Sequence, residues 1–168
     1  MRIFNERQKF NQLLLQIVMI STMALVVGIV VVVSPDLDVN SSEFWALIGC
    51  LMLTLVLFIF IMFFLKLETK IDEQGIHYGF WPFQLNLKLI SWLDINECYV
   101  RSYSPIAEYG GWGYRSIGFG KNGTAYNVKG SKGIQIVMKN DKRILIGTQK
   151  DTEAERIINS FFIKKKSL

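Results

Sequence analysis

Two long runs without a charged residue constrain this chain more than any other feature. They are Leu13 to Val33, with 21 residues, and Phe44 to Leu65, with 22. A bilayer core about 30 Å thick needs about 20 apolar residues in a helix. Helices of globular proteins are typically about half as long. The sequence therefore predicts a hairpin of two transmembrane helices, over residues 13–33 and 44–65.

The first run also has some features of a secretory signal. Arg2, Arg7 and Lys9 precede it, but it exceeds the roughly 7–15 apolar residues of such a signal, and no small-residue cleavage pattern follows. We interpret it as an uncleaved signal-anchor.

The charges flanking the two runs predict their orientation. Residues 1–12 carry three positive charges and one negative, whereas residues 34–43 carry three acidic residues and no lysine or arginine. The positive-inside rule then places both termini in the cytoplasm, and we expect a bacterial inner-membrane protein. Residues 1–65 would form a tail and the hairpin, leaving residues 66–168 for one small cytosolic domain.

The interior of the predicted hairpin offers little chemistry. Neither run contains an ionisable residue, which disfavours a transporter or a channel. Small residues stand four apart at Ala24 and Gly28, and again at Ala46 and Cys50. Small residues with this spacing let membrane helices approach closely. The four residues either form the helix contact or face lipid, and the sequence does not decide between these alternatives.

From Lys66 onward the pattern changes to short alternating runs separated by Gly, Asn and Asp, which is typical of strands and turns. The predicted strands cover residues 67–71, 76–81, 85–89, 97–103, 124–128, 134–138 and 143–146. The polar residues 139–142 separate the last two strands and predict a hairpin. We expect six or seven strands, forming a mainly-β antiparallel barrel or sandwich.

One amphipathic helix is predicted at the C-terminal end, over residues 152–163. Its apolar residues recur with helical spacing at Ala154, Ile157, Ile158, Phe161 and Phe162. Asp151 or Thr152 can cap its start. The apolar stripe needs a cover, and we expect the sheet to provide it.

Several segments resemble the bacterial pleckstrin-homology-like (PH-like) domains of small two-span membrane proteins. The segments are Ile90–Ile95 (ISWLDI), Gly111–Arg115, Ala125–Asn127, Gly130, Gly133–Ile134 and Ile146–Lys150. The resemblance implies a PH-like barrel or sandwich capped by one C-terminal helix, and it implies no activity. This chain has Asp151 where that pattern often has proline, a departure that bears on the helix cap.

A glycine motif, G-x-G-x-x-G, occurs at Gly118–Gly123. A dinucleotide site needs a helix directly after this motif, whereas the following residues, Thr124 to Val128, predict a strand. We interpret the motif as a glycine-supported turn, because an Asn-Gly pair favours tight hairpins.

A second glycine-rich stretch, Gly110–Arg115, surrounds aromatic residues and an arginine. Tyr109, Trp112, Tyr114 and Arg115 could form a recognition rim, as such residues do at interfaces. Alternatively, Trp112 closes one end of the barrel or rests on the membrane surface.

No enzyme class finds support in the sequence. His77 is the only histidine, Cys50 lies in a predicted span, and Cys98 reads as a buried thiol. The motifs of zinc proteases, P-loop proteins and hydrolases are absent. The sequence thus predicts no catalytic residue, metal or cofactor, and it does not favour a small-molecule ligand.

Charge gives one functional lead. Residues 66–168 hold 16 lysine and arginine residues against 10 aspartate and glutamate. Anionic lipid attracts such surfaces. The candidate lipid-facing residues, if they share a face, are Lys121, Lys129, Lys132, Lys139, Lys142, Arg143 and Lys150. A solvated basic surface explains the same charges equally well, and nucleic-acid binding is disfavoured because no aromatic platform motif is present.

The favoured function is a non-catalytic docking or assembly module at the cytoplasmic face of the membrane. Its partners would be the bilayer and a protein, or a second copy of the chain. Sensing of anionic lipid headgroups through the basic loops is the alternative.

Overall fold

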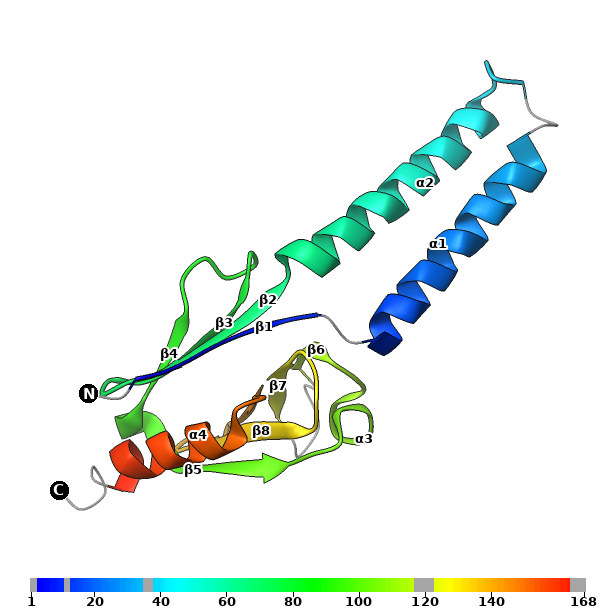
Figure 1. Ribbon diagram of the computed structural model, residues 1–168. Coiled ribbons are helices and arrows are strands. Elements are labelled where there is room, and N and C mark those ends of the chain that lie inside the picture. Colours follow the sequence, from blue (N-terminus) through cyan, green and yellow to red (C-terminus); the bar gives the residue numbers. More distant parts are fainter. Residues whose placement is uncertain (1–2, 11–12, 35–37, 117–122, 164–168) are drawn as a thin grey trace. The chain divides into compact units, whose positions relative to one another are not determined.

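The chain forms two compact units in the computed structural model, which describes residues 3–10, 13–34, 38–116 and 123–163 (Figure 1). One unit is Phe10–Leu65, and the other combines Met1–Lys9 with Lys66–Leu168.

The first unit is a pair of helices. Helix α1 covers Leu13–Val33, and α2 covers Ser42–Ile59 before a π-helical turn, η2, over Phe60–Phe64. Both α-helices are long and apolar enough to cross a membrane. The hydroxyls of Ser21 and Thr22 donate to the carbonyl of Val18, so these polar side chains are satisfied within their own helix.

Larger residues than expected line the contact between α1 and α2. The half-buried side chains include Met19, Met23, Val26 and Val30 on α1, and Phe44, Leu47, Leu51, Thr54 and Phe58 on α2. Their spacing alternates between three and four residues, which is the spacing of a coiled-coil seam.

The four small residues that were one candidate for this contact lie elsewhere on the helices. Ala24, Gly28, Ala46 and Cys50 are all exposed within the unit, and a methyl group added to Gly28 would meet no atom within 4 Å. The structure therefore places these four residues outside the contact between α1 and α2. The physical reason is that the seam follows the heptad spacing of bulky side chains, which places these small residues on the outer faces.

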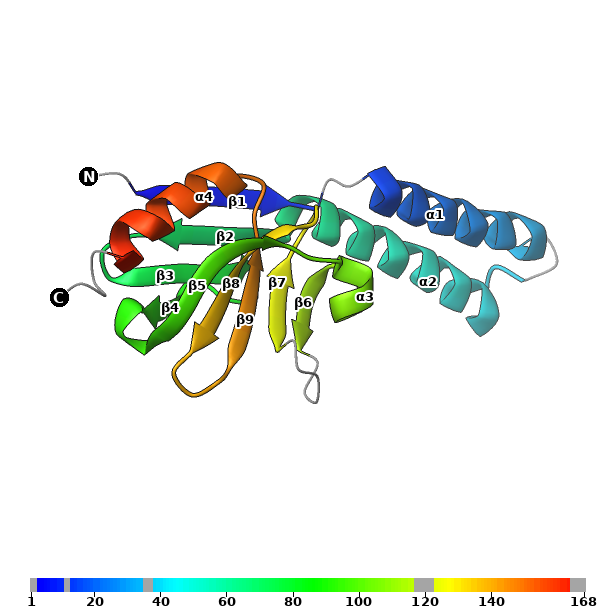
Figure 2. The ribbon, with the colours of Figure 1, turned by 90° about the horizontal axis from the view of Figure 1, so that it is seen from below.

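The second unit consists of two sheets. The first has the order β1 (Phe4–Lys9), β2 (Lys66–Ile71), β3 (Gly75–Trp81), β4 (Lys88–Ser91), and all its neighbours are antiparallel. The second has the order β5 (Ile95–Ser102), β8 (Lys132–Met138), β9 (Arg143–Gly147), β7 (Thr124–Asn127), β6 (Gly113–Ser116). Strands β7 and β9 are parallel, and the other neighbours are antiparallel. Figure 2 shows the strands of the two sheets running crosswise.

The core lies between the two sheets. Tyr126 of the second sheet contacts Tyr78 and Phe80 of the first, with ring centroids 4.7 and 6.2 Å apart. Fully or almost fully buried aliphatic side chains fill the rest: Leu67, Ile71, Ile76, Ile134, Ile136, Ile144 and Ile146. The expected mainly-β unit is confirmed, and among the described strands neither sheet closes on itself.

The predicted C-terminal helix is confirmed as α4, Asp151–Ile158, continued by a π-helical turn, η4, over Asn159–Ile163. Ala154, Ile157 and Ile158 are buried, and α4 contacts β1, β5 and β8. Trp92, in a 3-10 turn (η3, Trp92–Asp94), packs against the rings of Phe161 and Phe162, with centroids 6.3 and 6.0 Å away. The tryptophan of the ISWLDI segment therefore helps to cover the helical stripe.

Two local expectations need correction. The N-cap of α4 is Lys150, without a side-chain cap, because the chain turns into the helix where the Thr148 hydroxyl accepts from the Lys150 amide (3.0 Å). Strand β4 begins at Lys88 instead of residue 85, because Gln84 and its neighbours form a turn that returns to β3.

The largest difference from the sequence-based division concerns the N-terminal tail. Phe4–Lys9 form an edge strand of the first sheet, in register with Lys66–Ile71, and Phe4 is fully buried. Segments before and after the helical pair thus build one sheet. The sequence predicts a tail for this segment, yet its alternate residues Phe4, Glu6 and Gln8 are buried.

Polar contacts fix β1 to the connection between β9 and α4, and we call them the β1 clip. The Glu6 carboxylate accepts hydrogen bonds from the Thr148 hydroxyl (2.7 Å) and the Gln149 amide (2.8 Å). The Gln8 side chain donates to the Gly147 carbonyl at 2.7 Å. Hydrogen bonds to a charged acceptor are strong, and they offset the cost of burying this carboxylate. The clip joins the two sheets through the N-terminal strand.

We expect Thr148→Val to lower the free energy of unfolding of the full chain by about 1–3 kcal/mol, because it removes a donor from a buried carboxylate. Thr152→Val, the same change at an exposed position of α4, is the matched control. Thermal unfolding in detergent measures both variants, and equal midpoints would contradict the role given to the clip.

Candidate functional site

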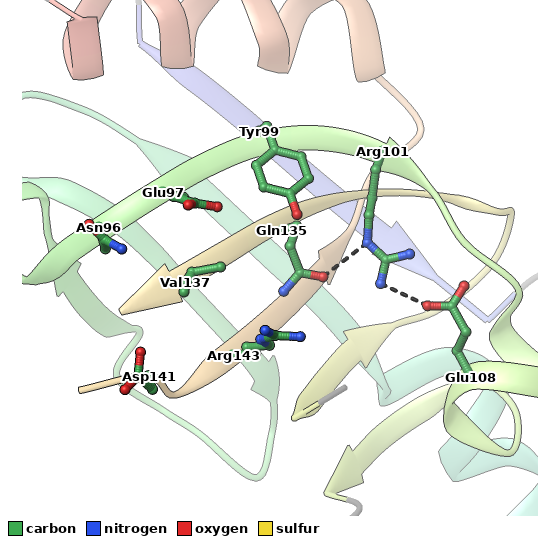
Figure 3. A pocket seen from close by; sticks show the side chains of 9 residues that line it. All are labelled: Asn96, Glu97, Tyr99, Arg101, Glu108, Gln135, Val137, Asp141 and Arg143. Carbon is green, nitrogen blue, oxygen red and sulfur yellow. Dashed lines mark hydrogen bonds and ion pairs between the residues drawn. The ribbon is translucent and has the colours of Figure 1, made fainter. Parts of the chain in front are cut away.

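A polar hollow lies on the face of the second sheet that points away from the core (Figure 3). Its volume is about 460 Å³. It is lined by Asn96, Glu97, Tyr99, Arg101, Glu108, Gln135, Val137, Asp141 and Arg143. Strands β5, β8 and β9 supply most of these side chains, and the short helix α3, Pro105–Tyr109, supplies Glu108.

Arg101 organises one end of the hollow. Its Nε donates to the Gln135 side chain (3.0 Å), and one terminal nitrogen donates to Glu108 Oε2 (2.8 Å). The same nitrogen reaches the Tyr109 hydroxyl at 3.3 Å, and the other donates to the Ser102 carbonyl at 3.2 Å. With these donors engaged inside the protein, Arg101 fixes α3 on the sheet.

Local sequence explains why α3 forms at this place. Ser104 caps the helix by accepting from the Ala107 amide, Pro105 occupies the first turn, and Gly110 ends it in a left-handed conformation. Glu108 returns to accept from the Ser104 amide at 2.8 Å. The hydrogen bond from Arg101 is the largest influence on this carboxyl, and it holds the pKa of Glu108 below the ordinary 4.5.

Tyr109 belongs to the core below α3. Only 1% of it is exposed, and it clusters with Tyr103, Ala125 and Leu145. This corrects the expectation that Tyr109 contributes to an exposed rim, because the helix turns its ring onto the sheet. Burial raises the pKa of Tyr103 to about 12, so this phenol stays neutral.

The glycine-rich segment after α3 is held to the neighbouring turn. Trp112 Nε1 donates to the Gly130 carbonyl (3.3 Å), and the Gly113 amide donates to the buried Asn127 side chain (2.8 Å). Arg115 Nε donates to the Trp112 carbonyl at 3.1 Å. Trp112 is half-buried, and its hydrogen bond joins this segment to the turn at Gly130.

Tyr114 and Arg115 lie on β6, one of the two edge strands of the second sheet and a strand that is not among those predicted from the sequence. Tyr114 is 58% exposed, and its ring centroid is 5.0 Å from that of Tyr126. Arg115 is also exposed. The structure therefore brings Trp112, Tyr114 and Arg115 together at one sheet edge, and we call these three residues the β6 rim.

The basic candidates are divided between the two ends of β8. Lys129 and Lys132 lie around the turn that enters β8, whereas Lys142 and Arg143 lie at the hairpin that follows it. Arg143 registers with Val137, five residues after Lys132, so the two ends are roughly 17 Å apart. Lys121 lies outside the described residues. These residues do not gather into a single patch.

Few of the described side chains are placed to act as catalytic groups. Cys98 is buried in β5, and burial raises the pKa of its thiol to about 12, so it is not a thiolate nucleophile at neutral pH. His77 lies in the first sheet, where its Nε2 is 3.1 Å from Asp72 in the β2–β3 turn. No group of three or more metal-ligating side chains occurs among the described residues. The hollow can offer hydrogen bonds and charge, which suits binding.

Sequence reasoning missed Arg101, Glu108 and Gln135. The signal that could have found part of this set is the segment Ser104 to Glu108, where a cap residue, a proline and a glutamate mark the start of a helix. Gln135 lies in an otherwise apolar strand, and its partner Arg101 is 34 residues away.

Comparison of the chain with protein-family models, with curated proteins and with solved structures gave no match.

We expect Glu108→Gln to lower the free energy of unfolding by about 1 kcal/mol at neutral pH, since the Arg101 pair is partly exposed. The folded-state pKa of Glu108 is lowered, so its contribution is present above pH 4.5 and is lost as the pH falls through that lowered value. The difference between the two proteins should therefore shrink below about pH 4. Glu97→Gln, an exposed change in the same hollow, is the control, and a pH-independent difference would contradict this account.

Proposed function

We propose that this chain is a non-catalytic, membrane-anchored docking module. Its helical pair would span a bacterial inner membrane, and its β unit would present a PH-like domain at the cytoplasmic face. The observation that carries the proposal is the β6 rim, which places an exposed tyrosine and arginine on the edge strand of a sheet.

The membrane part of the proposal is supported by the two apolar helices and by the pairing of β1 with β2. Two strands of one sheet must occupy the same compartment, so the helical pair has to leave and return to the same side. The basic tail and the acidic connector favour the cytoplasm as that side.

The docking part is supported by the properties of β6. An edge strand has backbone groups directed away from its sheet, and a partner strand can pair with them. Tyrosine, tryptophan and arginine are the residue types enriched at binding hot spots. The partner would be a protein segment in extended conformation, from another protein or from a second copy of the chain.

The PH-like part is supported by the arrangement of two crosswise sheets with one C-terminal helix packed on strands of both. Lipid-headgroup sensing through the basic loops has less support, because such binding would need Lys129, Lys132, Lys142 and Arg143 on one face. Their division between the two ends of β8 favours docking over headgroup sensing.

A photo-crosslinking amino acid at Tyr114, in the full chain in native membranes, tests the proposal. We expect one discrete adduct, and Arg115→Glu should reduce its yield about tenfold, as the loss of one hot-spot contact does. The matched control places the same amino acid at Tyr99, which is 45% exposed on β5, the opposite edge strand of the same sheet. Adducts that form equally from both positions, or that persist in Arg115→Glu, would contradict docking at the β6 rim.

A further inference from the structure

We infer that the loop between β3 and β4, residues 81–87, is a third membrane contact that inserts apolar side chains into the interfacial region of the bilayer. The inference rests on the proposed membrane-spanning role of the helical pair, and it is independent of docking at the β6 rim.

The loop is exposed and apolar. Phe83 is 72% exposed, Leu85 is 81% exposed and Trp81 is 38% exposed. Large exposed apolar residues that recur within one short loop suit a contact with another molecule or with a membrane. Tryptophan, in particular, is favoured at the boundary between lipid and water.

Chain connectivity places this loop near the end of the second span. Strand β2 begins at Lys66, and only Leu65 separates it from Phe64, the last residue of η2. Lys66 registers with Trp81, so their Cα atoms are about 5 Å apart. The loop thus begins at Trp81, which is paired with Lys66, the first residue after the second apolar run. This argument depends only on covalent connection and strand register.

The loop is held in shape by Gln84. Its amide donates to the Phe80 carbonyl at 2.8 Å, and its side-chain oxygen accepts from the Phe80 amide at 3.2 Å. A methyl group added to Gly79 would lie 3.0 Å from that oxygen, so the glycine gives Gln84 room to fold back. With Gln84 directed toward β3, its neighbours Phe83 and Leu85 are presented outward.

The charges around the loop suit an anionic lipid surface. Lys66 Nζ lies 5.5 Å from the centroid of the Trp81 ring, and Lys88 is exposed at the start of β4. Lys9 registers with Lys66 on the other side of β2 and is also exposed. Lysines that flank apolar residues hold their ammonium groups at headgroup depth while their stems contact apolar surface. Continuity with the span and this charge pattern together favour lipid as the occupant.

A nitroxide label at residue 85 tests the inference in the full chain, reconstituted in vesicles of phosphatidylethanolamine and phosphatidylglycerol. Leu85→Cys is labelled in a background without Cys50 and Cys98, and collisions with oxygen and with a water-soluble nickel chelate are compared. Leu93→Cys is the matched control, because Leu93 is 64% exposed and follows the end of β4 where Ser91 registers with Gly75. That end lies roughly 20 Å along β3 from Trp81. Leu25→Cys, in α1, reports on the span itself.

We expect the ratio of oxygen to nickel accessibility at residue 85 to be several-fold higher than at residue 93 and below that at residue 25. A lipid signal at residue 25 with equal, aqueous signals at residues 85 and 93 would overturn the inference and leave the span intact. Aqueous signals at all three positions would instead refute the membrane assignment on which the inference rests. An immobilised label at residue 85 that neither reagent reaches would overturn it in favour of a protein partner or a second copy.

Discussion

Backbone pairing between β1 and β2 is the interaction on which the rest of the structure depends. It joins a strand that precedes both apolar helices to the strand that follows them. Because both strands belong to one sheet, the two ends of the helical pair are tied to a single folded unit. A hairpin held in this way must begin and end on the same side of a membrane. The helical pair and the β unit are therefore interleaved along the chain.

The β1 clip extends this constraint into the second sheet. Glu6 accepts hydrogen bonds from Thr148 and Gln149, and the Gln149 side chain donates to the Lys129 carbonyl at 2.8 Å. The carbonyl of the next residue, Gly130, accepts a hydrogen bond from the indole N–H of Trp112. A continuous set of contacts thus runs from the N-terminal strand to the β6 rim. These contacts connect the glycine-rich segment to the rest of the β unit.

Much of the architecture follows from local sequence signals. The lengths of the uncharged runs predicted both helices, the apolar stripe from Ala154 to Phe162 predicted α4, and the polar residues 139–142 predicted the β8–β9 hairpin. These features depend on neighbours close in sequence, so periodicity and turn chemistry reveal them. For the same reason the segment Ser104 to Glu108 carries a helix signal that could have been used to predict α3.

The features that the sequence did not reveal depend on distant partners. Nothing near Glu6 in the sequence indicates that it is buried. Its hydrogen-bond donor, Thr148, lies 142 residues later in the chain. In the sequence, Gln135 merely interrupts an apolar strand. The structure shows that its side chain accepts a hydrogen bond from Arg101. Ala24 and Gly28 match the small-residue motif of helix packing. The helix contact is instead formed by larger side chains such as Met23, Val26 and Leu51, so the two small residues lie outside it. Pairing partners, and the face that a residue presents, are decided by tertiary structure.

The most direct measurement of the central claim is a disulfide across the first two strands. Arg7 and Glu68 are registered partners on an exposed face of the sheet, with Arg7 Nε 2.9 Å from Glu68 Oε1. With the native cysteines replaced by alanine, Arg7→Cys with Glu68→Cys should form the bond under mild oxidation in native membranes. Arg7→Cys with Lys70→Cys, two residues out of register, should form little of it, because a disulfide needs Cα atoms closer than about 7 Å. Failure of the registered pair to cross-link, or equal yields from both pairs, would contradict the pairing of β1 with β2 across the helical pair.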